Sequence, residues 1–445
     1  MQSNINELTV QNWLQGSWHD AAKVTFHEPE KGHLGSTTTT YLLDYFVEHA
    51  SVDAVQAPVV DERAVSVALP VGQDRWLPTW PSFLMDMLPQ GPARILLAKE
   101  IGWNGVLAES EMHLLRYSAA TPVGNLRIAE AAEREVLPGY PGISLDAVLG
   151  RTEMFNDYAA KLPKEVPSSV SLQGEWPKLM LTMADDGLLY PDACIPDSAA
   201  RQRFIVKLAR SRKSRDSLIL EIEALYAAAA FDLGLPVPEG YLSGPGVIMI
   251  PRFDRDATDG SVRWGQESIV SAAGISQFGH LGLHEDYIDL LSAISSDPEA
   301  DRLDYLKRDL LNLGFGNDDN HGRNTALSKK HGQVRLSQIF DLAPMRLSGN
   351  AVARSTRWKC MRGFGSDYYP KWDVVVEAIT ENESECVTVL DQLAAFAETL
   401  PQAAQKVAEK ASDKDAVLHA TLRLEALVGS VVAAAERRSA GISRG

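Results

Sequence analysis

The chain has 445 residues, of which 45% are hydrophobic and 23% are charged, and its 43 Lys and Arg against 59 Asp and Glu give a net charge of −16. This composition excludes collagen-like, mucin-like and wholly disordered proteins, and it leaves enough apolar material for a large core. So acidic a chain is a poor candidate for non-specific nucleic-acid binding, which depends on attraction to phosphates, although a local basic patch or a basic partner could still contact DNA. At about 150 residues per domain, the length predicts two or three domains.

The cysteines and the apolar stretches indicate the cellular compartment. Cys194, Cys360 and Cys386 are odd in number and widely spaced, so neither a disulfide framework nor a zinc ribbon is expected. The first residues lack the basic and apolar regions of a signal peptide. The longest uncharged apolar stretches, such as 224–231 and 427–435, are too short to cross a bilayer. We therefore expect a cytoplasmic protein without a membrane segment.

The N-terminal third mixes short strands with helices. The apolar, β-branched run at 65–71 predicts a strand, and residues 79–103 predict a helix that is broken at 88–92, where two prolines and a glycine occur. A short helix is expected within 143–162. We place the end of this region between about residues 140 and 165, because prolines are scattered there.

The middle of the chain has a different pattern. Residues 168–190 predict a strand, a glycine turn and a second strand, and 203–209 is a compact apolar strand that carries one lysine. Residues 217–234 predict a helix with Gly234 just beyond its end, and 247–250 predicts another buried strand.

Helices dominate after about residue 265. Segments 287–296 and 301–315 have apolar side chains at helical spacing, and the tail from Trp372 onward is rich in Ala and Leu. No internal repeat or low-complexity segment is present.

The polar segment from Asn317 to Asn324 lies between a predicted helix and a short apolar run. One interpretation is a solvated turn rich in Asn, Asp and Gly. A calcium-binding EF-hand is rejected: Gly322 would fit position 6, but position 12 is Ser328 rather than a bidentate Glu. A third interpretation is phosphoryl transfer, because Asp319 and Asn324 have the D-x-x-x-x-N spacing of a kinase catalytic loop.

A kinase also requires a metal-binding aspartate and a strand lysine. Asp341 follows an apolar strand-like run, as the metal-holding aspartate of kinases does, although on its own such an aspartate is more often a helix or turn cap than a ligand. Lys207 ends the strand FIVK, where kinases place the lysine that contacts phosphates, although such a lysine is often a surface residue. The following helix offers Glu223, which we prefer, or Glu221 as a partner for that lysine.

A phosphate-covering loop is the remaining kinase element. Residues 169–179 lie between two strand-like segments and contain Gly174, but no Walker A or G-x-G-x-x-G pattern is present. The order of the elements is informative: loop, lysine, glutamate, Asp–Asn pair and second aspartate follow one another as a kinase requires.

These segments together resemble the HipA family, the serine/threonine kinase toxins of bacterial toxin–antitoxin pairs. The D-x-H-x-x-N and RFDR pieces are the more specific parts of this resemblance, which covers nearly the whole chain. The matching segments are MLPQGPAR (87–94), SLQGEWPK (171–178), FIVK (204–207), LGLPVPE (233–239), RFDRD (252–256), NDDNHGRN (317–324) and FDL (340–342).

The resemblance implies a role for each catalytic residue. Lys207 would contact the phosphates of ATP, and Glu223 would be its partner. Asp319 would be the catalytic base, and Asn324 and Asp341 would ligate Mg²⁺.

The resemblance also implies a regulatory loop. Gly174 and Lys178 would belong to the nucleotide-covering loop, and Ser171 would be autophosphorylated, with Ser168 and Ser169 as alternatives. His321 would be structural or would face the phosphates. The RFDR element is expected to form a structural ion-pair network rather than to take part in catalysis.

The fold implied is α+β, with a small N-terminal α/β domain at 1–145, a kinase-like N-lobe at 146–260 and a mostly helical C-lobe at 261–445. The function implied is an ATP- and Mg²⁺-dependent protein kinase that restrains growth, with a translation or tRNA-charging factor as its substrate. A small helix-turn-helix antitoxin is the expected partner, so that DNA would be contacted only indirectly.

Two other functions remain open from the sequence. One is a nucleotide-binding scaffold or transcriptional co-regulator that acts with such an antitoxin without catalysis. The other is a kinase that phosphorylates a small molecule.

Overall fold

The computed structural model describes residues 6–51, 58–135, 139–172, 174–256, 262–349, 352–363 and 369–442. The chain forms two compact units, each assembled from segments that are distant in sequence. Unit 1 contains residues 1–212, 240–278 and 326–334, and unit 2 contains residues 213–239, 279–325 and 335–445. The three contiguous domains expected from the sequence remain a prediction.

The first sheet of unit 1 is antiparallel, with the strand order β4-β3-β2-β1-β5. In β1, every second side chain from Leu8 to Asn12 is buried, as expected for a strand with one face on the core. Gln15 and Gly16 both have positive φ and join β1 to β2 in a two-residue turn, the geometry that suits the twist of a hairpin. The strands are β1 (Glu7–Leu14), β2 (Ser17–Phe26), β3 (Thr37–Tyr41), β4 (Arg75–Leu77) and β5 (Leu126–Ile128).

Seven short helices also belong to this part of unit 1. The predicted helix at 79–103 is interrupted as expected, because α2 and α3 are separate, and the helix expected within 143–162 is two helices, α6 and α7. The helices are α1 (Leu43–His49), α2 (Leu84–Met87), α3 (Gly91–Glu100), α4 (Glu111–Ser118), α5 (Ala129–Arg134), α6 (Leu145–Leu149) and α7 (Glu153–Glu165).

The strand predicted at 65–71 is wrong. The segment is largely buried, but its regular pairing is limited to one isolated bridge between Ser66 and Leu69. Its polar groups are bonded to Glu267 instead: the Ser66 hydroxyl donates to Oε1 at 2.5 Å and the Val67 amide donates to Oε2 at 2.9 Å. A distant carboxylate therefore replaces the neighbouring strand that the apolar pattern suggested.

The second sheet of unit 1 has the order β7-β6-β8-β10-β9, and its neighbouring strands are antiparallel. The predicted strands at 203–209 and 247–250 are confirmed as β8 and β10. A 3-10 helix, Pro167–Val170, precedes the predicted phosphate loop, so the strand-like segment expected there is wrong. The strands are β6 (Lys178–Ala184), β7 (Leu189–Pro191), β8 (Ala200–Leu208), β9 (Leu242–Gly244) and β10 (Val247–Pro251).

A small third sheet has the order β11-β12-β13, with β11 (Gly265–Ser268), β12 (Ala326–Lys330) and β13 (Gln333–Leu336). A one-turn helix, α9 (Ile269–Ala272), follows β11. The fully buried Lys329 ammonium of β12 donates to Glu267 Oε2 of β11 at 3.2 Å.

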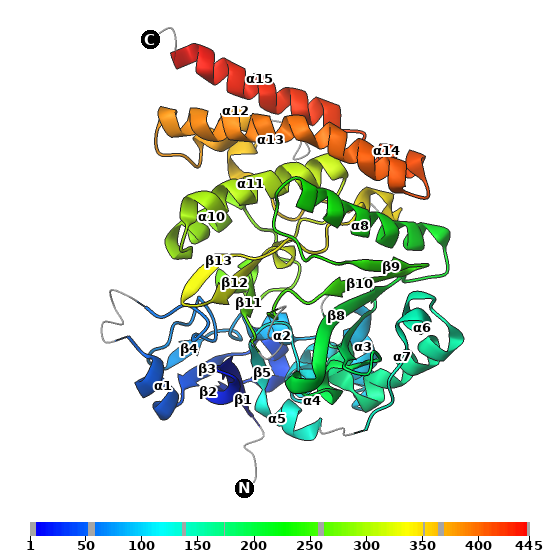
Figure 1. Ribbon diagram of the computed structural model, residues 1–445. Coiled ribbons are helices and arrows are strands. Elements are labelled where there is room, and N and C mark those ends of the chain that lie inside the picture. The colour runs from blue at the N-terminus through cyan, green and yellow to red at the C-terminus, as the bar shows by residue number, and fades with distance from the viewer. Residues whose placement is uncertain are drawn as a thin grey trace. The chain divides into compact units, whose positions relative to one another are not determined.

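Unit 2 is mostly helical, as predicted from the spacing of its apolar residues. Its long helices bury apolar stripes against one another, and α13 and α15 lie side by side (Figure 1). Figure 1 shows helices α8 (Ser214–Asp232), α10 (His284–Ile294), α11 (Pro298–Phe315), α12 (Trp372–Glu377), α13 (Glu383–Lys410), α14 (Lys414–Ala420) and α15 (Leu424–Ile442).

One helical stretch in the described chain, Lys414–Ala440, is long and apolar enough to cross a membrane by length and composition. The sequence prediction considered only uncharged runs and did not identify this stretch. Val417, Leu427 and Val431 of this stretch are buried within the protein. Core helices of soluble proteins also have this length and composition, and 33% of the most apolar window of this stretch is buried within the protein.

Candidate active site

The polar loop Asn317–Asn324 begins where helix α11 ends. Gly316 caps the helix with a left-handed backbone at φ 69°, and a Cβ at this position would lie 2.4 Å from the main-chain oxygen of Ala420. Only glycine fits this turn, which directs the chain from the helix into the loop. The Gly316 oxygen accepts the Arg346 amide at 3.0 Å, so the start of the loop is fixed on both sides.

Asp319 is an accessible carboxylate within this loop. Its side chain is 34% exposed, and His321 Nε2 lies 3.7 Å from Asp319 Oδ1. The side-chain amide of Asn324 donates to the main-chain oxygen of Asp319 at 3.0 Å. The Asp–Asn spacing therefore brings the two predicted residues together within one tight loop.

The neighbouring Asp318 has a different environment. It is buried, and its Oδ1 lies 3.6 Å from the guanidinium of Arg346 and 3.9 Å from that of Arg423. Two arginines hold this carboxylate, so Asp319 is the better placed of the two to meet a substrate.

Asp341 has an unusual backbone. Its φ is 53°, a left-handed conformation that is uncommon for a residue other than glycine. Its main-chain oxygen accepts hydrogen bonds from the side chain of Asn317 at 3.2 Å and from the Ala343 amide at 3.1 Å. The strand that the sequence places immediately before Asp341 is wrong, because β13 ends at Leu336 and an irregular segment follows. Strained backbones of this kind concentrate at functional sites.

A small cavity of about 40 Å³ links the two loops. Asp319 and Asn324 line it together with Phe340 and Leu342, the neighbours of Asp341. A cavity of this size can hold water but not a nucleotide, so it is not itself a nucleotide site. The loop that contains Asp319 and Asn324 therefore lies beside the segment that contains Asp341.

A buried cluster supports the loop from the side of α10 and α11. Asp309 of α11 forms an ion pair with Arg354 and accepts a hydrogen bond from the indole of Trp358 at 3.1 Å. Burial alone would raise the pKa of Asp309, but Arg354 and His284 lower it below its ordinary value. Burial lowers the pKa of His284 to about 4, so this imidazole is neutral at pH 7.

The cluster is connected to the loop through Asn320. Its side-chain amide donates to Thr356 O at 2.8 Å, and its Oδ1 accepts from the Ser355 amide at 3.0 Å. Asn317 and Asn320 were not singled out from the sequence. The signal that could have identified them is the high number of asparagines in this loop, because an asparagine side chain can bond to two main-chain groups at once.

In unit 1, Lys207 lies near the end of β8. It is opposite Lys178 of β6 and Ile248 of β10 in the register of the sheet. Its ammonium lies 5.6 Å from the centre of the Trp176 ring, and the Arg210 guanidinium lies 4.4 Å from the same ring. The predicted loop therefore places an aromatic ring beside the predicted phosphate-binding lysine.

The loop itself is short, and its glycine has a backbone conformation that other residues rarely adopt. Gly174 has φ 107°, and a Cβ there would lie 3.1 Å from the ammonium of Lys178. Gln173, which precedes it, lies outside the described residues.

The candidate phosphorylation sites are buried in this conformation. Ser168 and Ser169 are 0% exposed and Ser171 is 7% exposed. The Ser171 hydroxyl is 3.0 Å from that of Ser118, and the Ser168 amide donates to Glu135 Oε1 at 3.2 Å. Any kinase acting on these serines needs the segment to leave its present position.

Helix α8 carries the two candidate glutamates. Glu223 is buried, whereas both oxygens of Glu221 are used by Ser412, each at 2.6 Å. This favours Glu223 over Glu221 as a functional side chain, and its pairing with Lys207 remains a prediction.

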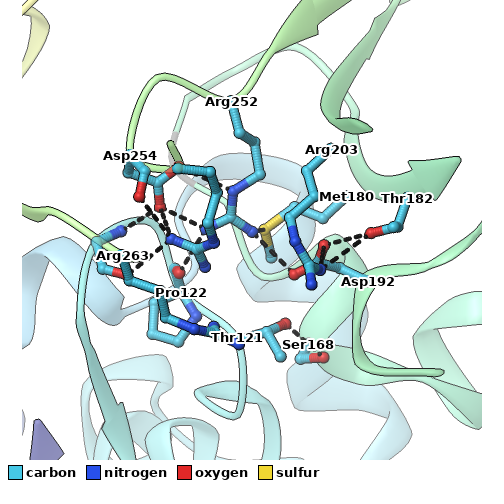
Figure 2. Close-up of polar contacts among 12 residues, drawn as sticks. Thr121, Pro122, Ser168, Met180, Thr182, Asp192, Arg203, Arg252, Asp254 and Arg263 are labelled. Atoms are coloured by element: carbon cyan, nitrogen blue, oxygen red, sulfur yellow. Dashed lines mark hydrogen bonds and ion pairs between the residues drawn. The ribbon is translucent and has the colours of Figure 1, made fainter. Parts of the chain in front are cut away.

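The RFDR element forms an ion-pair network inside unit 1, as predicted (Figure 2). The Arg252 guanidinium donates to Asp254 Oδ2 at 2.6 Å and to Asp192 Oδ2 at 3.0 Å. Arg203 of β8 donates to the other oxygen of Asp192 at 2.7 Å. Burial would raise the pKa of Asp254, but Arg252 and Arg255 lower it to about 2. The network connects β8 and β10 with the segment before β5, because Arg252 also donates to Pro122 O at 2.9 Å.

The oxygen donors of unit 2 fit a magnesium ion. Asn324 uses its amide nitrogen on Asp319, which leaves Oδ1 as the acceptor that it can offer to a cation. Mg²⁺ is commonly held by one or two carboxylates with substrate phosphates and water rather than by a full protein cage. The carboxylate of Asp341 and the Oδ1 of Asn324 are the donor types that such a site would use. Over the described ranges, no cluster of three or more His, Cys, Asp or Glu side chains is arranged as a metal site.

Comparison with known proteins gives three results. Residues 170–410, more than half of the chain, match the family model of the HipA-like C-terminal domain. A Sinorhizobium fredii protein named "Putative kinase Y4mE" is 26% identical over 277 residues, which are 58% of this chain and 63% of that protein. The alignment thus spans less than two thirds of that relative.

The third result is structural. A chain of the Shewanella oneidensis toxin–antitoxin complex of HipA, HipB and operator DNA matches with a TM-score of 0.61 and 17% identity, and 97% of each chain is covered. At this identity the similarity shows the fold alone. The α+β fold class predicted from the sequence is confirmed.

Proposed function

Because this chain belongs to the family defined by the HipA-like C-terminal domain, we propose that it is a HipA-type protein kinase. It would transfer the γ-phosphoryl group of ATP to a serine or threonine hydroxyl of a protein. The observation that carries this proposal is the arrangement of the Asn317–Asn324 loop, in which an accessible Asp319 is bonded through its main chain to the side chain of Asn324.

The chemistry requires positioning and counter-charge more than covalent participation by the protein, since the transition state is loose. Asp319 would accept a hydrogen bond from the substrate hydroxyl, orient it, and take its proton during transfer. Asn324 Oδ1 and the Asp341 carboxylate would hold Mg²⁺, which supplies neutralising charge to the phosphate oxygens when it is bound.

Unit 1 would supply the remaining contacts. Lys207 would donate to the nucleotide phosphates, Glu223 of unit 2 would orient it, and Gly174 and Lys178 would cover the nucleotide. His321, 3.7 Å from Asp319, would help hold that carboxylate or face the phosphates. That Lys207 and the unit 2 residues serve one nucleotide is part of the proposal.

Autophosphorylation of Ser171 would inactivate the kinase. Ser171 is the least buried of the three candidate serines, which favours it over Ser168 and Ser169. A phosphate adds a charge of about −1.5 to −2 at neutral pH, and the present packing against Ser118 leaves no room for it. The modified loop would therefore stay outside its present position and would no longer cover a nucleotide.

The proposal includes a partner and a compartment. The related Shewanella chain was solved with HipB and operator DNA, which supports a small helix-turn-helix antitoxin as the partner of this chain. With a net charge of −16, the chain would reach DNA through that partner rather than directly. We place the protein in the cytoplasm, where ATP and a translation or tRNA-charging substrate would be available.

The test is mass spectrometry of the purified protein and of a cell lysate after incubation with ATP, with and without Mg²⁺. The proposal expects a phosphate on Ser171 and on at least one lysate protein, both dependent on Mg²⁺. Labelling of a metabolite without any protein would show a small-molecule kinase. Nucleotide binding without any transfer would show a non-catalytic scaffold.

A further inference from the structure

Asn317 connects the two functional loops of unit 2. It is 4% exposed, and its side-chain nitrogen donates to Asn312 Oδ1 of α11 at 2.9 Å and to the main-chain oxygen of Asp341 at 3.2 Å. Its own amide donates to Asn312 O at 2.9 Å. One side chain therefore joins the end of α11, the start of the Asp319 loop and the backbone of Asp341.

The orientation of this amide is determined by its partners. A main-chain oxygen can only accept, so the atom facing Asp341 must be the nitrogen. The bond ends on the peptide oxygen of the residue with φ 53°, where the backbone needs support from its surroundings.

Two neighbouring side chains of the loop have other partners. Asp318 faces Arg346 and Arg423, and Asn320 is bonded to Ser355 and Thr356. The Asp341 oxygen also accepts the local Ala343 amide at 3.1 Å.

We infer that Asn317 is a positioning residue that sets the orientation of Asp341 toward Mg²⁺. This rests on the proposed function, because it assumes that Asp341 is a magnesium ligand. In this role Asn317 would act through the backbone of Asp341 rather than as a ligand of the metal. It holds the peptide that carries the ligand, as supporting residues around metal sites commonly do.

The isosteric variant Asn317→Asp provides the sharpest test, because it keeps the shape and replaces the donor by an acceptor that faces two other acceptors. Asn317→Ala removes the bonds without adding a charge. Asn312→Ala removes one partner of Asn317 from a helix position that is only half-buried. Binding of a non-hydrolysable ATP analogue is measured by calorimetry across a Mg²⁺ titration, and phosphoryl transfer is measured in parallel.

We expect the half-saturating Mg²⁺ concentration to rise about 10- to 100-fold in Asn317→Asp and less in the two alanine variants, whereas analogue binding without Mg²⁺ stays unchanged. High Mg²⁺ should restore part of the transfer rate. Asn12→Asp is the matched control, since Asn12 is a buried asparagine of β1 whose nitrogen donates to Glu62 O at 2.8 Å. It should lower stability and leave the Mg²⁺ requirement of the folded protein unchanged.

An unchanged half-saturating Mg²⁺ concentration in folded Asn317→Ala or Asn317→Asp would overturn the inference. If both fail to fold, an unchanged value in Asn312→Ala would overturn it. Failure of the proposed function has a different signature: the wild type itself would then show no Mg²⁺-dependent nucleotide binding or transfer.

Discussion

Two polar regions of this protein use the same kinds of side chain in opposite ways. In the ion-pair network of unit 1, Asp192 and Asp254 are fully enclosed and each is paired with at least two arginines. In the loop of unit 2, Asp319 remains a third exposed while the residues on either side of it are anchored.

This difference distinguishes carboxylates with a structural role from a carboxylate with a proposed functional role. A carboxylate whose oxygens are already bonded to arginines can hold segments together, but it has nothing left to offer a substrate. A carboxylate on a fixed backbone with an accessible side chain can meet a ligand without reorganising. Substitution of the exposed Asp319 is therefore expected to lower activity, whereas substitution of the enclosed Asp254 is expected to lower stability.

The largest effect is expected from Asp319→Asn. It removes the proposed base and should lower the rate of phosphoryl transfer by about 10²- to 10⁴-fold. Stability should change little, because the side chain is partly exposed and the main-chain bond from Asn324 remains. Transfer of labelled phosphate and urea unfolding measure the two quantities. A variant that keeps the wild-type rate would exclude Asp319 as the base.

Stability should show the opposite pattern in the ion-pair network. Arg203→Ala leaves Asp192 with one fewer arginine and should cost about 3–5 kcal/mol of unfolding free energy, as removal of one partner from a buried pair does. Arg201 is two residues away on β8, 60% exposed, and paired with an exposed Asp185. Arg201→Ala should change stability by less than about 0.5 kcal/mol. Equal losses in the two variants would contradict the structural role of the network.

A third prediction uses a buried carboxylate outside the ion-pair network. Burial raises the pKa of Glu135 to about 7 from an ordinary value of 4.5. Between these pH values the folded protein holds a proton that the unfolded chain has lost, so this group lowers stability as the pH rises from about 4.5 to 7, by up to about 3 kcal/mol. Glu135→Gln should remove that slope in urea unfolding curves measured across this range. Identical slopes in both proteins would show that Glu135 ionises normally.

The smallest effect is expected from removing the hydroxyl group that contacts Ser171. Ser118→Ala removes the partner of the Ser171 hydroxyl and should loosen the segment by about 1 kcal/mol, as the loss of one hydrogen bond does. We expect Ser171 to be phosphorylated about fivefold faster, in line with that free energy. A time course of phosphate incorporation measures this rate. No change in the rate would mean that the Ser118 contact does not limit exposure of Ser171.

Local patterns were sufficient to predict much of the fold. The apolar spacing in α10 and α11 follows the helical period, and β8 and β10 are short apolar runs bounded by polar residues. The Asp–Asn spacing also corresponds to a contact in the structure, because the Asn324 side chain donates a hydrogen bond to the main-chain oxygen of Asp319.

The remainder depends on contacts between residues that are distant in sequence. The segment at 65–71 has the composition of a strand, but Glu267 satisfies its polar groups. In the sequence Asn317 and Asn320 look like ordinary loop residues. The structure shows that they donate hydrogen bonds to Asp341 and Thr356. The burial of Ser171 likewise depends on Ser118, which no local pattern identifies.

The most direct test of the account is a crystal structure of the protein with Mg²⁺ and a non-hydrolysable ATP analogue. The account predicts a metal ion ligated by Asn324 Oδ1 and the Asp341 carboxylate, with Lys207 on the nucleotide phosphates and the Asp319 carboxylate facing the γ-phosphate. A nucleotide bound elsewhere, or a metal ion that contacts neither Asn324 nor Asp341, would contradict it.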